Sequence, residues 1–368
     1  MSTRARLTAL LLCSVILTAC GPSSDVETEV AELEKKTQQT PDKVQTSPLP
    51  APSLLGATGL AAKDERAEII LLLPDVRIAM QEFQRNGLAM LVGRQAGYML
   101  TTHDAAGSGT KQVEQFRQAI AAKPAAIIVS PIDPPAFAAL IVEAQTAGII
   151  VIGLDKRMLN EGCTSLVYSD QRTVGRLAAD TVLEALKRKA AEENRSEVTG
   201  RVIQLRGSAD SHASDEIAAG FSEGLRTQPG VILVHDAPAD WTSETATQRT
   251  TEAFRLQKNF DAIYAHNDAI AVGAAKAAET ASERENIFIV GTDGISGQKK
   301  GMELVRQGEI DATIVQPALV DLALQIIVKV RSDKTFKPEP AYEIQPVTVV
   351  PKNVEQSLRV GTYKLPRL

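Results

Sequence analysis

The sequence contains few of the residues that build metal sites, disulfide frameworks or nucleic-acid surfaces. Three of its 368 residues are cysteine, four are histidine and one is tryptophan, and aromatic residues make up only 4%. The histidines show no metal-ligand spacing, and no nucleophile stands beside a general base, so neither a metal nor a catalytic centre is expected. The net charge of −5 leaves no basic footprint for nucleic acid. We therefore expect a binding protein rather than an enzyme, with no nucleic-acid partner.

A cofactor is not expected either. Gly107-Ser108-Gly109 follows a predicted strand and precedes a predicted helix, as a dinucleotide loop would. The stretch lacks the third glycine that such a loop needs for close packing of helix on strand. We therefore predict no bound cofactor.

The N-terminus accounts for the cysteine at position 20. Arg4 and Arg6 precede an apolar run over 7–17 that is too short to span a bilayer as a mature helix, and Ala19 stands before Cys20. This order is typical of a secretory signal peptide, here 1–20. Because it ends on cysteine, it resembles the lipobox of bacterial lipoproteins, which implies that Cys20 is lipidated and becomes the mature N-terminus. The alternative is an ordinary signal peptide with an incidental Cys20.

The segment 21–66 is predicted to be a flexible tether. It combines several prolines with Ser, Thr, Gln and charges, and it has few bulky apolar residues to bury. Cys13 leaves with the signal peptide and Cys20 would carry the lipid, so Cys163 is expected to remain alone, without a partner for an intrachain disulfide. The protein is thus expected on the periplasmic or extracytoplasmic side, anchored to the cell membrane or outer membrane through the lipid.

From Glu68 onward, short apolar runs alternate with helical segments. Continuous apolar runs of this length are typical of strands buried on both faces. Strands are predicted at 69–73, 98–102, 125–129, 149–154, 201–205, 231–237, 262–265 and 287–291, and helices at 78–96, 111–122, 135–147, 174–189, 216–227, 242–256 and 269–279. The alternation predicts an α/β protein with two doubly wound parallel-sheet lobes, separated near Ser169.

Polar residues follow most of these strands. Ligands of doubly wound sheets bind outside the carboxyl ends of the strands, so these loops are the candidate site. Carboxylates and amides can pair with adjacent hydroxyls, and a flat ring such as Trp241 can cover a sugar face. Helix caps and turns favour the same residues, so both interpretations stay open for each one. The residues are 74–77, 155–157, 239–241, 266–268, 292–294 and Gln316.

Five stretches give the chain a specific resemblance. They are 125–131 (AAIIVSP), 147–155 (AGIIVIGLD), 265–268 (AHND), 289–294 (IVGTDG) and 312–316 (ATIVQ). Together, in this order, they resemble the periplasmic sugar-binding proteins related to the ribose- and galactose-binding proteins, the soluble receptors of carbohydrate ABC importers. The resemblance covers about 68–350. It implies the type I periplasmic binding protein fold, with a three-crossover hinge.

The resemblance also implies lobe boundaries. The N-terminal lobe would comprise 67–169 and 317–345, and the C-terminal lobe 170–316 and 346–368. The tail over 352–368 has no clear assignment within this scheme.

Carried over residue by residue, the resemblance implies a ligand site. Asp155 stands where a carboxylate grips sugar hydroxyls, and Lys156 where the family usually has arginine. Asn267 and Asp293 match an amide and a carboxylate of the second lobe. Gln316 matches a glutamine at the hinge edge, and Trp241 an aromatic ring that faces the sugar.

The first loop departs from the family pattern. Where the family has two stacking aromatic residues, this chain reads from Arg77 to Met80 and Gln81, and the arginine expected before the Gly-Phe pair at 220–221 is absent. Arg77 and Lys156 could instead meet a negative group, and Gln81 is a further candidate contact. A polyol, amino sugar or acidic derivative is therefore expected rather than a neutral aldopentose.

The function predicted from these features is extracytoplasmic solute binding. The protein would capture a small polar ligand by hinge closure of its lobes and deliver it, as a monomer, to the permease of an ABC importer. An alternative is a ligand sensor that docks to a chemoreceptor or sensor kinase. The ligand domain of a transcription repressor shares the fold, but it would need a helix-turn-helix where this chain has its signal peptide.

Overall fold

The computed structural model describes residues 66–155, 157–158, 161–257, 259–297, 300–360 and 362–368. The predicted signal peptide, Cys20 and all of the tether except Arg66 lie outside these residues, as does Lys156.

The first lobe is built on a six-stranded sheet in which every pairing is parallel. Its register joins Ile69 to Leu100 and Ile70 to Ile127. The strand order is β11 (Ala341–Glu343), β5 (Ser165–Tyr168), β4 (Ile150–Gly153), β3 (Ala126–Val129), β1 (Ala67–Leu73) and β2 (Tyr98–Asp104).

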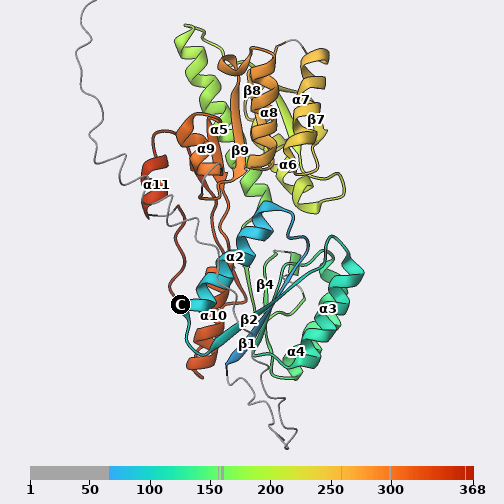
Figure 1. The fold of residues 1–368 in the computed structure, drawn as a ribbon. Helices are drawn as coiled ribbons and strands as arrows, with labels where there is room; N and C mark the ends of the chain where they lie inside the picture. Colours follow the sequence, from blue (N-terminus) through green and yellow to red (C-terminus); the bar gives the residue numbers. More distant parts are fainter. Residues whose placement is uncertain (1–65, 156, 159–160, 258, 298–299, 361) are drawn as a thin grey trace, which may run out of the picture. The chain divides into compact units, whose positions relative to one another are not determined.

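Helices cover both faces of this sheet (Figure 1). Ile69 and Leu71 of β1 pack with α2 (Ala79–Arg94) and α10 (Val320–Ser332). Ile70 and Leu72 pack on the other face with α3 (Gly109–Ala122), η1 (Pro134–Phe137) and α4 (Ala138–Thr146). Because successive side chains of a strand point to opposite faces, a strand covered twice must be apolar throughout, which explains the unbroken run in β1.

The second lobe repeats the arrangement with a mixed sheet. Its order is β12 (Val347–Val349), β10 (Ala312–Val315), β9 (Phe288–Asp293), β8 (Ala262–Ala265), β6 (Gly200–Arg206) and β7 (Val231–Pro238). The edge strand β12 runs antiparallel to β10, and the other pairs are parallel. A short η3 (Arg284–Asn286) precedes β9.

Two helix layers cover this second sheet (Figure 1). The helices α5 (Gln171–Glu192) and α6 (His212–Leu225) pack on one face. The other face is covered by α7 (Ser243–Leu256), α8 (Asp268–Thr280) and α9 (Gly301–Gln307), and α11 (Val354–Val360) lies against α9. A Cβ atom at Gly220 of α6 would lie 2.0 Å from the carbonyl oxygen of Arg172, so glycine permits the close crossing of α5 and α6.

The chain passes between the two sheets after β5, after β10 and after β11. The last residues differ from the predicted lobe boundary. We placed 346–368 in the second lobe, and β12 joins the second sheet, but Leu365 and Leu368 pack against the core of the first lobe. The physical reason is burial of apolar surface, because these two leucines pack against the hydrophobic cluster to which α2 and α10 contribute.

Candidate functional site

Two identical turns stand at the ends of β1 and β4 in the first lobe. In each, an aspartate accepts a hydrogen bond from the backbone N–H two residues on and pairs with that residue's guanidinium. Arg77 Nη2 lies 2.6 Å from Asp75 Oδ2, and Arg157 Nη2 lies 2.7 Å from Asp155 Oδ2. The bond from Arg77 holds the pKa of the Asp75 carboxyl below its usual value. The negative charge of each aspartate is therefore matched by the positive charge of a neighbouring arginine.

These pairs change two expectations from the sequence. Arg77, expected to meet a negative group, is already paired with Asp75, and its side chain is 77% exposed. Arg157 lies within the candidate loop 155–157, but no role was predicted for it, although it shares a bidentate ion pair with the predicted Asp155. The signal that could have found it is the Asp-x-Arg pattern, which occurs after two strands.

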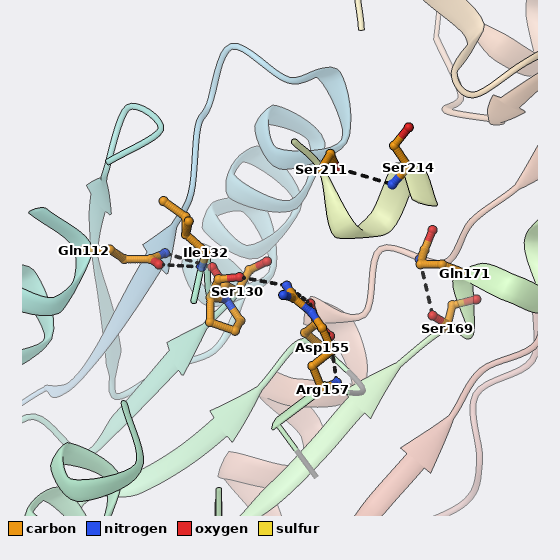
Figure 2. Close-up of polar contacts among 10 residues, drawn as sticks. Gln112, Ser130, Ile132, Asp155, Arg157, Ser169, Gln171, Ser211 and Ser214 are labelled. Atoms are coloured by element: carbon orange, nitrogen blue, oxygen red, sulfur yellow. Dashed lines mark hydrogen bonds and ion pairs between the residues drawn. The ribbon is translucent and has the colours of Figure 1, made fainter. Parts of the chain in front are cut away.

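The loop after β3 is fixed beside Arg157 (Figure 2). The buried Gln112 of α3 donates to the carbonyl of Ser130 at 2.8 Å and accepts from the N–H of Ile132 at 2.8 Å. Arg157 Nη2 approaches the carbonyl of Pro131 at 3.4 Å. Because β3 lies between β1 and β4, this loop sits between the two Asp-x-Arg turns.

In the second lobe, Asn267 caps helix α8. Its Oδ1 accepts from the N–H of Ile270 at 2.7 Å, and its Nδ2 donates to the carbonyl of Trp241 at 3.2 Å. Only 2% of the residue is exposed. Asn267 therefore does act as a helix cap. Its bond to Trp241 uses one of its two amide protons, which leaves the other for a ligand.

The backbone around Trp241 is unusual. Asp240 and Trp241 both have positive φ, at 50° and 61°. The indole ring lies against the backbone of Gly207, where a Cβ atom would come within 2.1 Å of the ring, so glycine is required there. Positive φ in consecutive non-glycine residues is costly and collects at functional sites. The geometry places the ring beside Gly207, at the end of β6, and its contact with a ligand stays a prediction.

Asp293 and Gln316 are joined at the ends of β9 and β10. Gln316 donates its backbone N–H to the carbonyl of Asp293 at 3.1 Å and its Nε2 to Oδ1 at 3.3 Å. Asp293 is 6% exposed and has a φ of 97°. Burial, followed by the charge of nearby Asp268, raises the pKa of Asp293 well above its usual value.

Asp268 lies close to Asp293, because it accepts a hydrogen bond from the next residue, Gly294. Thr313 donates its hydroxyl to Oδ1 at 2.7 Å, and the N–H of Gly294 donates to Oδ2 at 2.8 Å. Burial raises the pKa of this carboxyl to about 7, and the two hydrogen bonds only partly oppose the shift. Two neighbouring carboxyl groups therefore share one buried region, so each makes it harder for the other to ionise.

Gln171 connects this region to the crossover between the lobes. Its Nε2 donates to Gln316 Oε1 at 2.9 Å. It also donates to the carbonyl of Ser169 at 3.3 Å, the bond drawn in Figure 2. A continuous chain of side chains thus runs from the first crossover through Gln316 to Asp293. Gln171 was not predicted, because neither its type nor its neighbours in the sequence distinguish it from a helix-start residue.

His266 has a structural role. It is fully buried, and burial lowers the pKa of its imidazole to about 3, so it is neutral. The N–H of Gly207 lies 3.3 Å from Nδ1, and Nε2 of the Gln204 amide lies 2.9 Å from the Nε2 atom of the imidazole. Ser214, which follows the N-cap Ser211 of α6, also contacts Nδ1 at 3.3 Å. These contacts fix the start of α6, which is drawn in Figure 2.

A guanidinium approaches the start of α6 from a neighbouring strand. Arg206, at the end of β6, pairs with Asp236 at 2.8 Å and with Asp215 at 3.6 Å. Asp215 lies in the first turn of α6, the region where the family arginine was expected. The charge of Arg206 also contributes to the low pKa of His266.

Gln81 of α2 belongs to the first lobe. Its Oε1 is buried without a hydrogen-bond partner among the described residues. A buried carbonyl oxygen normally has a partner, so this atom is a candidate contact for a bound group.

The described residues contain neither a metal-binding cluster nor a helix that could span a membrane. Within the part of the chain that the structure describes, no group of three or more His, Cys, Asp or Glu is arranged to hold a metal ion. No helix in that part is both long enough and apolar enough to cross a membrane.

Comparison with known proteins identifies the family. The sequence profile described as "Periplasmic binding protein domain" matches residues 69–330. The chain belongs to this periplasmic binding protein family. Its membership and the predicted type I fold, with two α/β lobes, are both confirmed. The family consists of substrate-binding proteins of ABC transporters rather than enzymes, and it works outside the cytoplasm.

Curated relatives of this periplasmic binding protein are identical to it at about a quarter of the aligned positions. It is 26% identical over 243 residues to the ribose import binding protein of Haemophilus influenzae, covering 66% of this chain and 77% of the relative. It is 25% identical over 254 residues to the putative rhizopine-binding protein of Rhizobium meliloti, covering 66% and 78%.

Solved structures agree. A periplasmic solute-binding protein of an ABC transporter from Actinobacillus succinogenes, with bound D-allose, has a TM-score of 0.69 and 26% identity, covering 79% of this chain and all of that one. The Caulobacter myo-inositol binding protein has a TM-score of 0.68 and 22% identity, covering 82% and 99%, and it supports the fold alone.

Proposed function

We propose that this protein captures a sugar, a polyol or a sugar derivative between its two lobes and delivers it to the permease of an ABC importer. Asp155 of the first lobe and Asp293, Asn267 and Gln316 of the second would hold its hydroxyls, with the ring of Trp241 against one face. Gln81 would contact the ligand from α2, and Lys156 and Arg77 from the first-lobe loops.

One observation carries this proposal more than any other. Polar side chains stand at the carboxyl ends of the strands in both sheets, and the bond from Gln171 to Gln316 links the crossover to the second-lobe set. A ligand that engaged both sets would stabilise the closed arrangement of the lobes, which couples binding to closure.

The charges favour a neutral ligand over an acidic one. The guanidinium groups of Arg77 and Arg157 are each paired with an aspartate of the same turn. A carboxylate or phosphate on the ligand would have to compete with those ion pairs, whereas hydroxyls can bond to the outer oxygen lone pairs without breaking them. Neutral polyols and hexoses are therefore candidates ahead of sugar acids. Ribose is placed lower for a separate reason, because the first loop has Met80 and Gln81 in place of stacking aromatic residues.

We further propose that the protein acts as a monomer held at the membrane by a lipid on Cys20, with 21–66 as its tether. A sensor that presents the same closed form to a chemoreceptor or kinase remains the second candidate. The neighbouring genes separate the two: a permease and an ATPase favour import, and a kinase favours sensing.

The first experiment is a thermal-shift screen of a fragment that begins at Arg66. The panel contains myo-inositol, D-allose, D-ribose, amino sugars and sugar acids. A bound ligand raises apparent stability by roughly 2.7 kcal/mol at a hundredfold excess over its dissociation constant. A panel in which no compound raises the melting temperature would contradict the proposal.

The second experiment uses the compound that binds. Asp155→Ala should lower its affinity about ten- to a hundredfold, because a hydrogen bond to a charged group is worth about 1.5–3 kcal/mol. Asp133→Ala, an exposed aspartate of the same lobe, is the matched control. Calorimetry measures both variants, and small-angle scattering should show the parent compacting with ligand. If Asp155→Ala binds the compound as tightly as the parent does, Asp155 is not part of the ligand site.

A further inference from the structure

The segment after α11 contacts both lobes. Leu358 of α11 packs against the core of the second lobe, and Leu365 and Leu368 pack against the core of the first. Tyr363 packs against both cores. The chain therefore runs from the second lobe to the first once more beyond β12, in a segment to which the sequence assigned no role.

Tyr363 also holds the crossover that follows β10. The N–H of Ala318 donates to the Tyr363 hydroxyl oxygen at 3.3 Å, and that hydroxyl donates to Asp321 Oδ2 at 3.2 Å. From the other side, Nε2 of the buried Gln84 of α2 donates to the carbonyl of Ala318 at 3.0 Å. Both polar groups of the Ala318 backbone are thus bound by side chains distant in the sequence. Burial and the charge of Asp321 raise the pKa of the Tyr363 hydroxyl to about 12, so it keeps its proton at neutral pH.

The backbone conformation of Leu319, the next residue, explains why the hydrogen bonds to Ala318 are needed. Leu319 has φ 70° and ψ −34°, a conformation that a bulky side chain strongly disfavours. A strained backbone of this kind persists only where its surroundings hold it in place. Leu319 lies three residues beyond Gln316, which is bonded to Asp293 through both backbone and side chain. A change of backbone conformation at 318–319 would therefore move the groups proposed to hold the ligand.

We propose that Tyr363 is a positioning residue that clamps the crossover 316–319 and, through it, sets the orientation of Gln316 and Asp293. The tail thus couples the second crossover to the ligand site. The importance of that coupling for binding rests on the proposed function, but the clamp itself can be tested without any ligand.

The test is hydrogen exchange of the ligand-free full-length protein, with Tyr363→Phe as the main variant. This change removes the hydroxyl and keeps the ring. Tyr342→Phe is the matched control, because the Tyr342 hydroxyl likewise accepts from a backbone N–H, that of Glu339 at 3.0 Å, but within the first lobe. Gln84→Met removes the opposite side of the clamp.

In Tyr363→Phe, exchange in 316–320 should accelerate about three- to tenfold, the range expected for one lost hydrogen bond. The acceleration should extend to 291–297, which contains Asp293, and to 169–173, which contains Gln171. Gln84→Met should give the same pattern. Tyr342→Phe should accelerate exchange around 339–343 and leave these segments unchanged.

The clamp is disproved if Tyr363→Phe accelerates exchange in 316–320 alone, or nowhere beyond the control, since the hydroxyl would then be a local structural contact. The two proposals fail in different ways. Absence of binding in the ligand screen contradicts the proposed function, whereas the exchange pattern of ligand-free protein decides the clamp.

Discussion

At the scale of single residues, most polar groups of the candidate site already have a structural partner. Asp155 pairs with Arg157, Asn267 caps α8, and Asp293 accepts from Gln316. A strand-end residue can be both a cap and a ligand contact, because a carboxylate or amide has more bonding positions than one partner uses. Separating the two roles requires substitutions that remove one and keep the other.

Asn267 permits such a separation. Asn267→Ala removes both the cap and the amide donor, so it should lower the free energy of unfolding by about 1 kcal/mol and also weaken ligand binding. Asn267→Ser keeps an oxygen that can cap α8 but has no amide N–H. It should melt close to the parent and still bind weakly, as measured by thermal melting and calorimetry. Parent-like binding by Asn267→Ser would leave Asn267 with the cap alone.

Asp268 predicts a pH dependence of stability. Its pKa is about 7 in the folded protein against an ordinary value of 3.8, so the folded state holds this proton more tightly than the unfolded chain. The stabilisation is complete below the ordinary value and is lost as the pH rises toward 7. Because the pKa of nearby Asp293 is also raised, by burial and by the charge of Asp268, the two losses should overlap.

The variant that tests this is Asp268→Asn, which cannot ionise. The difference in free energy of unfolding between parent and variant should move in favour of the parent as the pH falls from about 7 to about 4. Urea unfolding at several pH values measures it, with exposed Asp133→Asn as control. A difference that stays constant over this range would show that Asp268 ionises normally.

At the scale of elements, the crossing of α5 and α6 in the second lobe depends on close packing of the two helix backbones. Glycines of α5 and α6 meet the partner helix's backbone: a Cβ at Gly175 would lie 2.0 Å from the carbonyl oxygen of Ile217, as one at Gly220 would from Arg172. The same two helices carry an ion-pair group in which Arg172 pairs with Glu216 and Glu223. The side chains of these charged residues are 34–38% exposed, so packing rather than ion pairing should dominate the stability of this crossing.

Gly220→Ala should therefore lower the free energy of unfolding by about 1–3 kcal/mol, the usual cost of overpacking. The matched control is Gly93→Ala in α2, where nothing lies within 4 Å of the added Cβ. That change should leave stability unchanged or raise it by up to about 1 kcal/mol, since alanine favours helix. Urea unfolding compares the two, and an equal effect of both substitutions would contradict the packing argument.

At the scale of the whole molecule, several segments connect the two sheets. The crossovers after β5 and β10 are joined by the bond from Gln171 to Gln316, and the tail reaches both cores through Tyr363. Hinge motion in a protein of two lobes is absorbed by a few such residues. The two sheets are thus connected by side-chain contacts in addition to the covalent crossovers.

The membrane anchor is a prediction about the whole protein that concerns residues outside those described. Cys20→Ala should remove the lipid attachment and release the protein from the membrane fraction of fractionated cells. Cys163→Ala is a suitable control, because it removes a cysteine and leaves the N-terminus intact. Membrane retention of Cys20→Ala equal to that of the parent would contradict lipid anchoring.

The sequence by itself determined the class of fold, because strands covered on both faces must be continuously apolar and helices must alternate with them. The predicted strand at 262–265 coincides with β8, and the other seven predicted strands lie within a few residues of those observed. The short strands β5, β10, β11 and β12 were not predicted, since three or four residues carry too little periodicity to distinguish a strand from a loop.

The same reasoning located the ends of the strands, and with them Asp155, Asn267, Asp293 and Gln316, because parallel strands share one carboxyl edge. The sequence could not say which partner each side chain meets. Gln171 lies 145 positions from Gln316, and Gln84 lies 234 positions from Ala318. Such contacts depend on how the elements pack in three dimensions, and no local pattern encodes them. Only the tertiary structure therefore decided that Arg157 balances Asp155, that Gln171 links the crossover to the site, and that the tail grips Ala318 through Tyr363.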